Sequence, residues 1–277
     1  MSAHMLVSDP AVLAQKARDV RLGVLDMVMR AGMGHTGSSL SCADIMTMLW
    51  YGVMRHDPLQ PKWPERDRFI LSKGHAVESY AVILNDLGYF PKDLLDTFCQ
   101  NGSSLLGHPN NKVPGMEMNT GALGHGLSLG IGMALGGQMD GAAFHTYVLM
   151  GDGEQAEGSV WEAAMAASYY RLHNLTVIVD RNRLQISGDT EEVMALEPFA
   201  NKWRAFGWHV SEVDGHDHGT LLQAFAVQSD KPKLIIAHTV KGKGIPFMEN
   251  VAHWHHGVPT PEEYDIAVKA LGGEAHG

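Results

Sequence analysis

The chain has 277 residues, of which 45% are hydrophobic and 19% are charged, a composition typical of an ordinary soluble globular protein. Lys and Arg number 21 against 31 Asp and Glu, and the resulting net charge of −10 opposes a nucleic-acid or anionic-membrane partner. Two cysteines, Cys42 and Cys99, are too few for a disulfide framework, and without a signal peptide or a bilayer-length apolar run we expect a cytoplasmic protein.

The first half of the chain predicts two helices, a strand and a further helix. Asp9-Pro10 is typical of an N-cap followed by proline at the first helical position, which predicts a helix to about Arg30. Apolar residues recur at helical spacing over 41–54. Next we expect a short buried strand over 67–72 and a helix over 73–90.

Glycines are concentrated in the middle of the chain. Residues 102–137 contain ten of the 31 glycines, and apolar residues alternate with them. This pattern indicates backbone that closely approaches a ligand or another helix, because a flexible linker would not carry the apolar residues. The last part of this region, 124–137, is expected to be a glycine-rich helix.

The second half alternates strands with helices, which predicts βαβ units and a parallel sheet. We therefore expect one α/β domain over 1–277, with a central, mostly parallel sheet flanked by helices on both faces. The final residues from Ala267 are expected to fray. The predicted strands are 145–150, 174–180, 208–214 and 233–239, and the predicted helices are 159–173, 199–207 and 219–228.

Polar residues follow two of these strands directly. Asp152 lies between two glycines after 145–150, and Asn182 follows 174–180. A right-handed crossover can set these strand ends side by side, where ligands of parallel sheets gather. Mg²⁺ prefers carboxylate, amide and carbonyl oxygens together with phosphate oxygens, so Asp152, Asn182 and the carbonyl of Leu184 are candidate ligands. Taken alone, the pair can equally be a turn aspartate and a helix-capping asparagine.

The order GDG, helix, apolar strand and Asn, with 28 residues between Gly153 and Asn182, resembles the thiamine diphosphate motif. The resemblance extends over nearly the whole chain to the diphosphate-binding half of transketolase, most closely to forms split over two genes. It implies the thiamine diphosphate-binding fold. The matching landmarks are "GMGHTGSSLSCADIMTMLW", "RDRFILSKGHA", "GHP", "NTGALGHGLSLGIGMALG", "GDGEQAEGSVWEA", "VDRNRLQISG", "VDGHDHGTLLQAF" and "HTVKGKGIPFMENVAHWHHGVP".

The resemblance implies site residues. Asp152, Asn182 and the Leu184 carbonyl would hold the metal, Mg²⁺ or Ca²⁺. His35 and His256 would manage substrate protons, His108 would hold the hydroxyls of the donor, and His75 would contact the diphosphate side. "WHHG" leaves His255 or His256 open as the functional residue, and the "HGVP" register favours His256. The implied cofactor-binding residues are His75, Gly121, Ala122, Leu123, Gly151, Asp152, Gly153, Glu154, Asn182, Ile186 and His256.

Two motifs depart from the family pattern, and two glutamates have a simpler structural explanation than a functional role. Gly121–Gly126 reads Gly-Ala-Leu-Gly-His-Gly instead of Gly-Pro-Leu-Gly-Gln-Gly, and His35-Thr36-Gly37 replaces His-Pro-Gly. Both departures bear on which substrate is accepted. Glu157 and Glu162 fit a solvated first helical turn. By resemblance they would join a carboxylate network that crosses a subunit interface.

The resemblance implies transfer of a two-carbon ketol (glycolaldehyde) unit from a ketose or ketose phosphate to an aldose or aldose phosphate, as in the pentose phosphate pathway. One alternative is another thiamine diphosphate carboligase, acting on a branched or sulfonated sugar or resembling deoxyxylulose phosphate synthase. Another is a non-catalytic cofactor-binding subunit or a nucleotide-binding Rossmann domain. The Rossmann reading requires G-x-G-x-x-G after a strand, whereas "GALGHG" follows none.

In the resembling family a glutamate of the pyrimidine-binding domain completes the cofactor site. That domain would follow the diphosphate-binding one, and the present sequence ends at Gly277. We therefore expect a second, C-terminal-type subunit, in an α2β2 heterotetramer.

Overall fold

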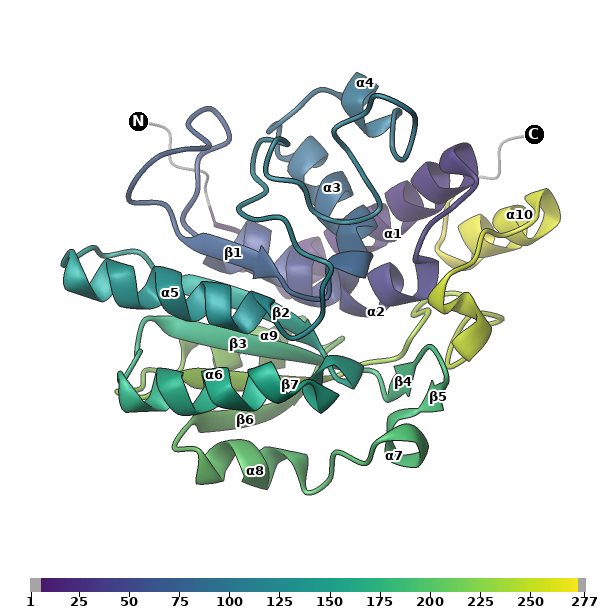
Figure 1. Cartoon of the computed structure of the whole chain (residues 1–277). Helices are drawn as coiled ribbons and strands as arrows, with labels where there is room; N and C mark the ends of the chain where they lie inside the picture. The colour runs from purple at the N-terminus through teal and green to yellow at the C-terminus, as the bar shows by residue number, and fades with distance from the viewer. Residues whose placement is uncertain (1–5, 274–277) are drawn as a thin grey trace.

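A five-stranded parallel sheet forms the centre of the protein (Figure 1). The computed structural model describes residues 6–273. Every neighbouring pair of strands is parallel, in the order β1-β2-β3-β7-β6, which confirms the expected parallel α/β sheet. The strands are β1 (Arg68–Leu71), β2 (Thr146–Gly151), β3 (Leu175–Arg181), β6 (His209–Asp214) and β7 (Lys233–His238).

Helices cover both faces of the sheet and enclose two apolar cores (Figure 1). One core joins the sheet to α1 (Pro10–Ala31), α2 (Thr36–Thr47), α3 (Val77–Asp86) and α9 (His218–Ala226). The other joins it to α5 (Gly126–Met139), α6 (Gly158–Tyr169) and α8 (Phe199–Ala205).

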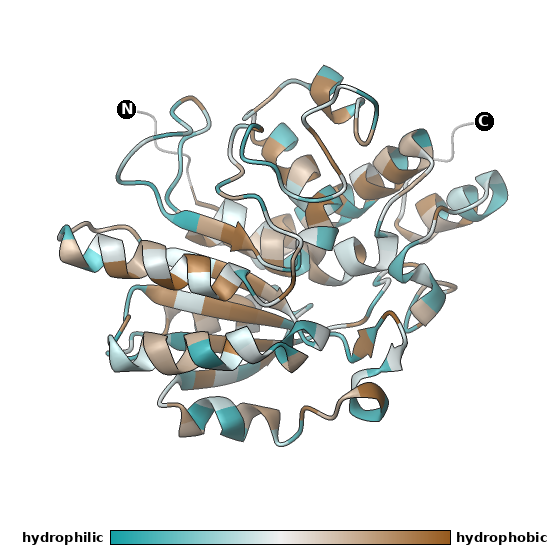
Figure 2. Cartoon of the chain, in the orientation of Figure 1, coloured by the Kyte–Doolittle hydropathy of each residue, from teal (hydrophilic) through white to brown (hydrophobic). Residues whose placement is uncertain are grey.

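Successive strand residues enter opposite cores. In β2, Tyr147 and Leu149 pack into the first core, whereas Val148 and Met150 pack into the second. A strand buried on both faces has no polar side, which is why these segments are near-continuous apolar runs (Figure 2).

The helices α2 and α3 differ in their bounds from the prediction, and α3, over Val77–Asp86, is shorter at both ends than the predicted helix over 73–90. α1 begins as expected, with the Asp9 carboxylate accepting from the Ala11 N–H at 2.8 Å. α2 begins at Thr36, five residues before the predicted start at 41, and continues into a π-helical turn η1 (Met48–Val53). All its residues are buried, so no polar face marks its beginning in the sequence.

The expectation of fraying from Ala267 is wrong for the residues that the structure describes. Helix α10 (Pro261–Ala270) has a complete capping box, in which Thr260 and Glu263 satisfy each other's backbone N–H groups. It buries Ala267 and Val268 in the core that contains α1. Residues 274–277 lie outside the described residues.

Short elements without a clear periodicity were not predicted, because two to four residues are too few to show one. No helix in the described part of the chain combines the length and apolar character that a membrane span requires. The unpredicted elements are η2 (Gly74–Ala76), α4 (Lys92–Leu95), η3 (Gly153–Ala156), the antiparallel pair β4 (Leu184–Gln185) and β5 (Gly188–Asp189), α7 (Thr190–Val193) and η4 (Ala252–His255).

Candidate active site

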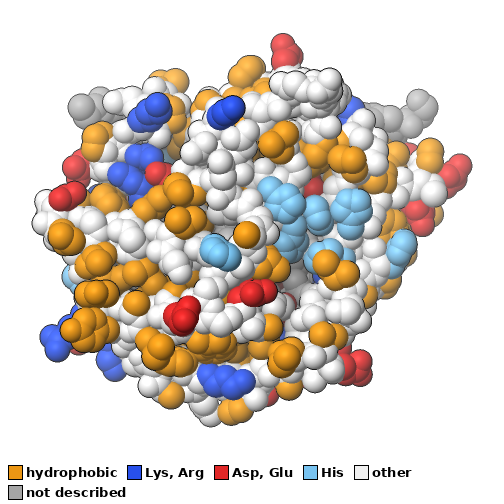
Figure 3. Space-filling view, in the orientation of Figure 1, with side chains coloured by type: hydrophobic (Ala, Val, Ile, Leu, Met, Phe, Trp, Pro, Cys, Tyr) orange, Lys and Arg blue, Asp and Glu red, His pale blue; other side chains and the backbone are white. Residues whose placement is uncertain are grey.

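The segments that follow four strands line a cleft of about 460 Å³. Lys73 and His75 come from the segment after β1, Asp152 from that after β2, Asn182 from that after β3 and Lys241 from that after β7. The carboxyl edge of a parallel sheet is where such folds bind ligands. On the surface the cleft is a hollow bordered by a group of histidines (Figure 3).

Strand register brings Asp152 and Asn182 together, as the crossover argument predicted. Gly151 of β2 lies opposite Asp180 of β3, so the residues that follow both strands leave the sheet side by side. The Arg183 N–H donates to Asp152 Oδ2 at 2.5 Å. Both side chains are buried and line the cleft, and their role as metal ligands remains a prediction.

The candidate metal donors are one carboxylate, one amide and one carbonyl oxygen. Within residues 6–273 no group of three or more His, Cys, Asp or Glu side chains could hold a metal ion. A cation beside Asp152 would therefore take further oxygens from phosphate or water, the usual pattern for Mg²⁺. Burial and the nearby Asp180 raise the pKa of Asp152 to about 6, with Arg181 acting in the opposite direction.

A buried ion pair supports the floor of the cleft. Lys73 donates to Asp180, which also accepts from Ser41 Oγ at 2.6 Å and from Thr239. Burial alone would raise the pKa of Asp180, but Lys73 and these hydrogen bonds hold it below its ordinary value. Asp180 is therefore a buried, ionised carboxylate whose main counter-charge is Lys73.

Replacing Lys73 by Met should destabilise the protein by about 3–5 kcal/mol, because it leaves Asp180 buried without its cation. Denaturant unfolding of the cofactor-free chain measures this. The double variant Lys73→Met/Asp180→Leu should recover part of the loss. A single variant as stable as the wild type would contradict the assigned ion pair.

Four histidines surround a fifth, His35, at one side of the cleft. Its ring centroid lies 5.7 Å from that of His75, 5.6 Å from His108, 6.0 Å from His255 and 4.9 Å from His256. They come from four separate parts of the chain, which the fold brings to one side of the cleft. This convergence agrees with the prediction that histidines border the site.

Burial and nearby positive charge lower the pKa of four of these imidazoles. Burial, His256, His108 and Lys241 lower the pKa of His35 to about 4, and burial and Lys241 lower that of His255 to about 3. Burial also lowers the pKa of His75 and of His108 below the ordinary value. At neutral pH each of these four rings therefore offers one N–H donor and one acceptor nitrogen.

A chain of hydrogen bonds anchors the backbone that precedes Lys241, which lines the cleft. The preceding Val240 N–H donates to His216 Nε2 at 2.9 Å, and His216 Nδ1 donates to Asp44 at 2.7 Å. Arg21 binds the same carboxylate. Lys241 Nζ then contacts the Leu184 carbonyl at 3.3 Å. Burial and Lys73 lower the pKa of Lys241 to about 8.

His255 and His256 have different positions. Lys241 Nζ lies 2.7 Å from His255 Nδ1, which must therefore accept, so His255 carries its proton on Nε2. His255 lines the cleft, whereas the more exposed His256 packs its ring against His35. Both lie within reach of His35, and the preference for His256 remains a prediction.

The glutamates of "GDGEQAEGSVWEA" divide by environment. Glu154 is buried, and its carboxylate accepts from Ser72, from the Gly124 N–H at 2.8 Å and from the Gly151 N–H at 3.1 Å. It therefore joins the loops that carry the cleft glycines. Glu157 is exposed at the cleft edge and Glu162 is exposed on α6.

Most of the predicted cofactor residues line the cleft, and Ala122 and His256 are the two that do not. Several lining residues were not predicted. Lys73 and Lys241 had a readable signal, because each precedes a glycine shortly after a strand of the parallel sheet. The other lining residues that were not predicted as ligands are Ser38, Ala156, Glu157, Gln185 and Ser187, whereas His255 was left open as an alternative to His256.

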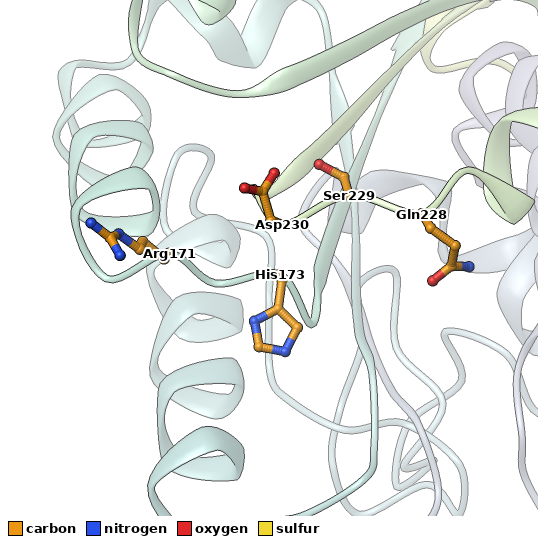
Figure 4. Close-up of a pocket in the computed structure, with 5 residues that line it drawn as sticks. All are labelled: Arg171, His173, Gln228, Ser229 and Asp230. Atoms are coloured by element: carbon orange, nitrogen blue, oxygen red, sulfur yellow. The ribbon is translucent and has the colours of Figure 1, made fainter.

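A second depression, of about 550 Å³, lies at the opposite edge of the sheet, where the segments before β3 and β7 meet. Arg171, His173 and Asp230 border it, all exposed, and their side chains do not converge on one point (Figure 4). It offers no constellation for catalysis, and its residues provide control positions remote from the cleft.

A family model and individual relatives of known name all match this chain to transketolases. Residues 13–276 match the family model described as transketolase, thiamine diphosphate binding domain. The chain is 52% identical over 254 residues to a subunit of the apulose-4-phosphate transketolase of Phocaeicola vulgatus, covering 91% of this chain and 90% of that relative. It is 41% identical over 263 residues to a 6-deoxy-6-sulfo-D-fructose transketolase subunit of a Clostridium species, covering 94% and 96%.

Solved structures show the same fold in longer chains. The crystal structure of transketolase from Campylobacter jejuni matches with a TM-score of 0.91 at 31% identity. The match covers 96% of this chain but 43% of the Campylobacter one, so the present chain corresponds to less than half of that enzyme.

Proposed function

We propose a function from the premise that this chain belongs to the transketolase family: it is the subunit of a split transketolase that holds the diphosphate end of thiamine diphosphate. The observation that carries the proposal is the meeting of Asp152 and Asn182 at adjacent strand ends, in a cleft that also holds His35, His75 and His108.

The residues of the cleft fit the cofactor and a divalent cation. Asp152, Asn182 and the Leu184 carbonyl would hold Mg²⁺ or Ca²⁺, and Lys241, which lines the same cleft, would supply positive charge to the diphosphate. At Gly121 an added Cβ would lie 2.7 Å from the His108 ring, so that position requires the absence of a side chain. Thiamine diphosphate, when bound, supplies the stabilisation of a carbanion.

The proposed reaction is transfer of a two-carbon ketol unit from a ketose or ketose phosphate to an aldose or aldose phosphate. The relatives named above act, by their names, on apulose-4-phosphate and on 6-deoxy-6-sulfo-D-fructose. These names favour an unusual sugar as the donor for this chain as well.

A partner subunit is part of the proposal. A relative matched over 90% of its own length is named as one subunit of its enzyme. We propose that the partner is the C-terminal, pyrimidine-binding subunit, in an α2β2 assembly.

Within this reaction the histidines would manage the protons of the sugar hydroxyls. His35 and His256 would accept and return these protons, because a neutral imidazole presents an acceptor nitrogen and can later donate. His108 would hold donor hydroxyls, and His75, whose pKa is lowered by burial and by the buried Lys73, would contact the diphosphate side.

Replacing His35 or His256 by Ala should lower kcat by about 10²–10⁴-fold, the usual contribution of an acid–base group, with little change in cofactor affinity. Ketol transfer by the enzyme reconstituted with its partner measures kcat, and calorimetry measures the affinity. His173→Ala, at the opposite edge of the sheet, is the matched control (Figure 4). Wild-type turnover in both site variants would remove these histidines from the mechanism.

A further inference from the structure

We propose that Glu78 is a positioning residue for His35: its buried carboxylate holds the imidazole proton on Nδ1 and leaves Nε2 as the acceptor on the cleft side. The contact itself does not depend on the reaction, whereas its consequence for turnover rests on the proposed function. Glu78 belongs to none of the sequence motifs that predict the site.

Glu78 is the second residue of α3 and is fully buried. One oxygen, Oε1, accepts from the backbone N–H of His35 at 2.7 Å, and the other accepts from Ser39 Oγ at 2.7 Å. Because His35 is the N-cap residue of α2, the carboxylate fixes the backbone from which the imidazole projects. The same Oε1 lies 3.9 Å from His35 Nδ1.

His35 Nδ1 is buried and has no hydrogen-bond partner among the described residues. Its side chain is 19% exposed and lines the cleft, so the outer edge of the ring carries Nε2. An unprotonated Nδ1 would direct its lone pair at a carboxylate oxygen, whereas Nδ1–H directs a positive hydrogen at it. Glu78 Oε1 accepts one hydrogen bond, from the His35 backbone N–H, and keeps a further lone pair. It can therefore favour the tautomer of His35 that carries its proton on Nδ1.

The surroundings of His35 strengthen the influence of the Glu78 carboxylate on its tautomer. The other titratable neighbours of His35 are the four imidazoles and Lys241, none of which carries a negative charge. In a buried site an interaction at this distance is several times stronger than in water. Burial raises the pKa of Glu78, while the bonds from His35 N and Ser39 Oγ favour its ionised form. The result is a ring with a fixed acceptor facing the substrate volume.

Glu78→Gln tests the proposal, because it keeps the shape and an oxygen for the His35 N–H but removes the charge. Ser39→Ala is the matched control, since it removes the other bond to Glu78 and leaves the charge. ¹⁵N spectra of the full chain labelled at histidine, with the His35 signals assigned from His35→Gln, report the tautomer without cofactor or partner.

In the wild type and in Ser39→Ala we expect His35 to carry its proton on Nδ1, and in Glu78→Gln we expect a mixture of tautomers. In the reconstituted enzyme Glu78→Gln should lower kcat by roughly tenfold and leave the KM for the cofactor within about twofold. A wild-type proton on Nε2, or a tautomer ratio unchanged by Glu78→Gln, would overturn the proposal. If the spectra are as expected but the reconstituted enzyme transfers no ketol unit, the proposed function is refuted. The effect of Glu78 on the His35 tautomer would still hold.

Discussion

Purified alone, the chain should transfer no detectable ketol unit, and the partner subunit should raise turnover by at least roughly 10³-fold. Loss of a single preorganised hydrogen-bonding group costs about 10²–10³-fold, and here a whole half of the site would be missing. The buried carboxylates of the cleft are already engaged, since Glu154 accepts three hydrogen bonds and Asp152 accepts from Gly153, Arg181 and Arg183. We expect a partner to supply the glutamate that the resemblance assigns to the pyrimidine end of the cofactor.

The measurement is ketol transfer by each subunit separately and by the mixture, with size-exclusion chromatography to show that a complex forms. The partner alone is the control for contaminating activity. Full turnover by the present chain without its partner would contradict the split-enzyme proposal.

Asp152→Ala should weaken Mg²⁺-dependent binding of thiamine diphosphate by about 2–5 kcal/mol, roughly 30- to 4,000-fold in Kd. The variant removes the one carboxylate among the candidate ligands, so the cation loses its only charged protein oxygen. Asn182→Ala should have a smaller effect of about 1–2 kcal/mol, because an amide is neutral. The fold should survive in Asp152→Ala, since Arg181 keeps its bonds to Thr190, Glu191 and Glu197.

Calorimetry on the reconstituted complex measures these affinities, and thermal unfolding reports whether the variants are folded. Asp230→Ala is the matched control, because Asp230 is an exposed aspartate in the depression at the other edge of the sheet. A folded Asp152→Ala variant with wild-type cofactor affinity would remove Asp152 from the metal site.

The sheet and the Asp152–Asn182 pair were predictable because they depend on local patterns. β2, β3 and β7 are apolar runs bounded by polar residues, and parallel strands bring their carboxyl ends to one edge whatever the details of packing. The pairing of Asp152 with Asn182 follows from this topology alone.

Contacts between distant segments were not predictable. The bonds from Asp44 through His216 to Val240 join three separate parts of the chain, and no periodicity connects them. Glu78 lies inside the predicted helix over 73–90, where an acidic residue is ordinary, and only the packing of α3 against α2 places it beside His35. The early start of α2 was hidden for a related reason, because complete burial removes the polar face that marks a helix.

The most direct test of the account is the affinity of the reconstituted complex for thiamine diphosphate, measured by calorimetry in Mg²⁺ and again in EDTA, with thiamine as the comparison ligand. The diphosphate and Asp152 repel each other unless a divalent cation lies between them, and thiamine lacks the group that this subunit would hold. We expect tight binding of thiamine diphosphate in Mg²⁺, little or none in EDTA, and weak binding of thiamine in both. Equal affinity for thiamine diphosphate in Mg²⁺ and in EDTA would contradict the assignment of this cleft as a metal–diphosphate site.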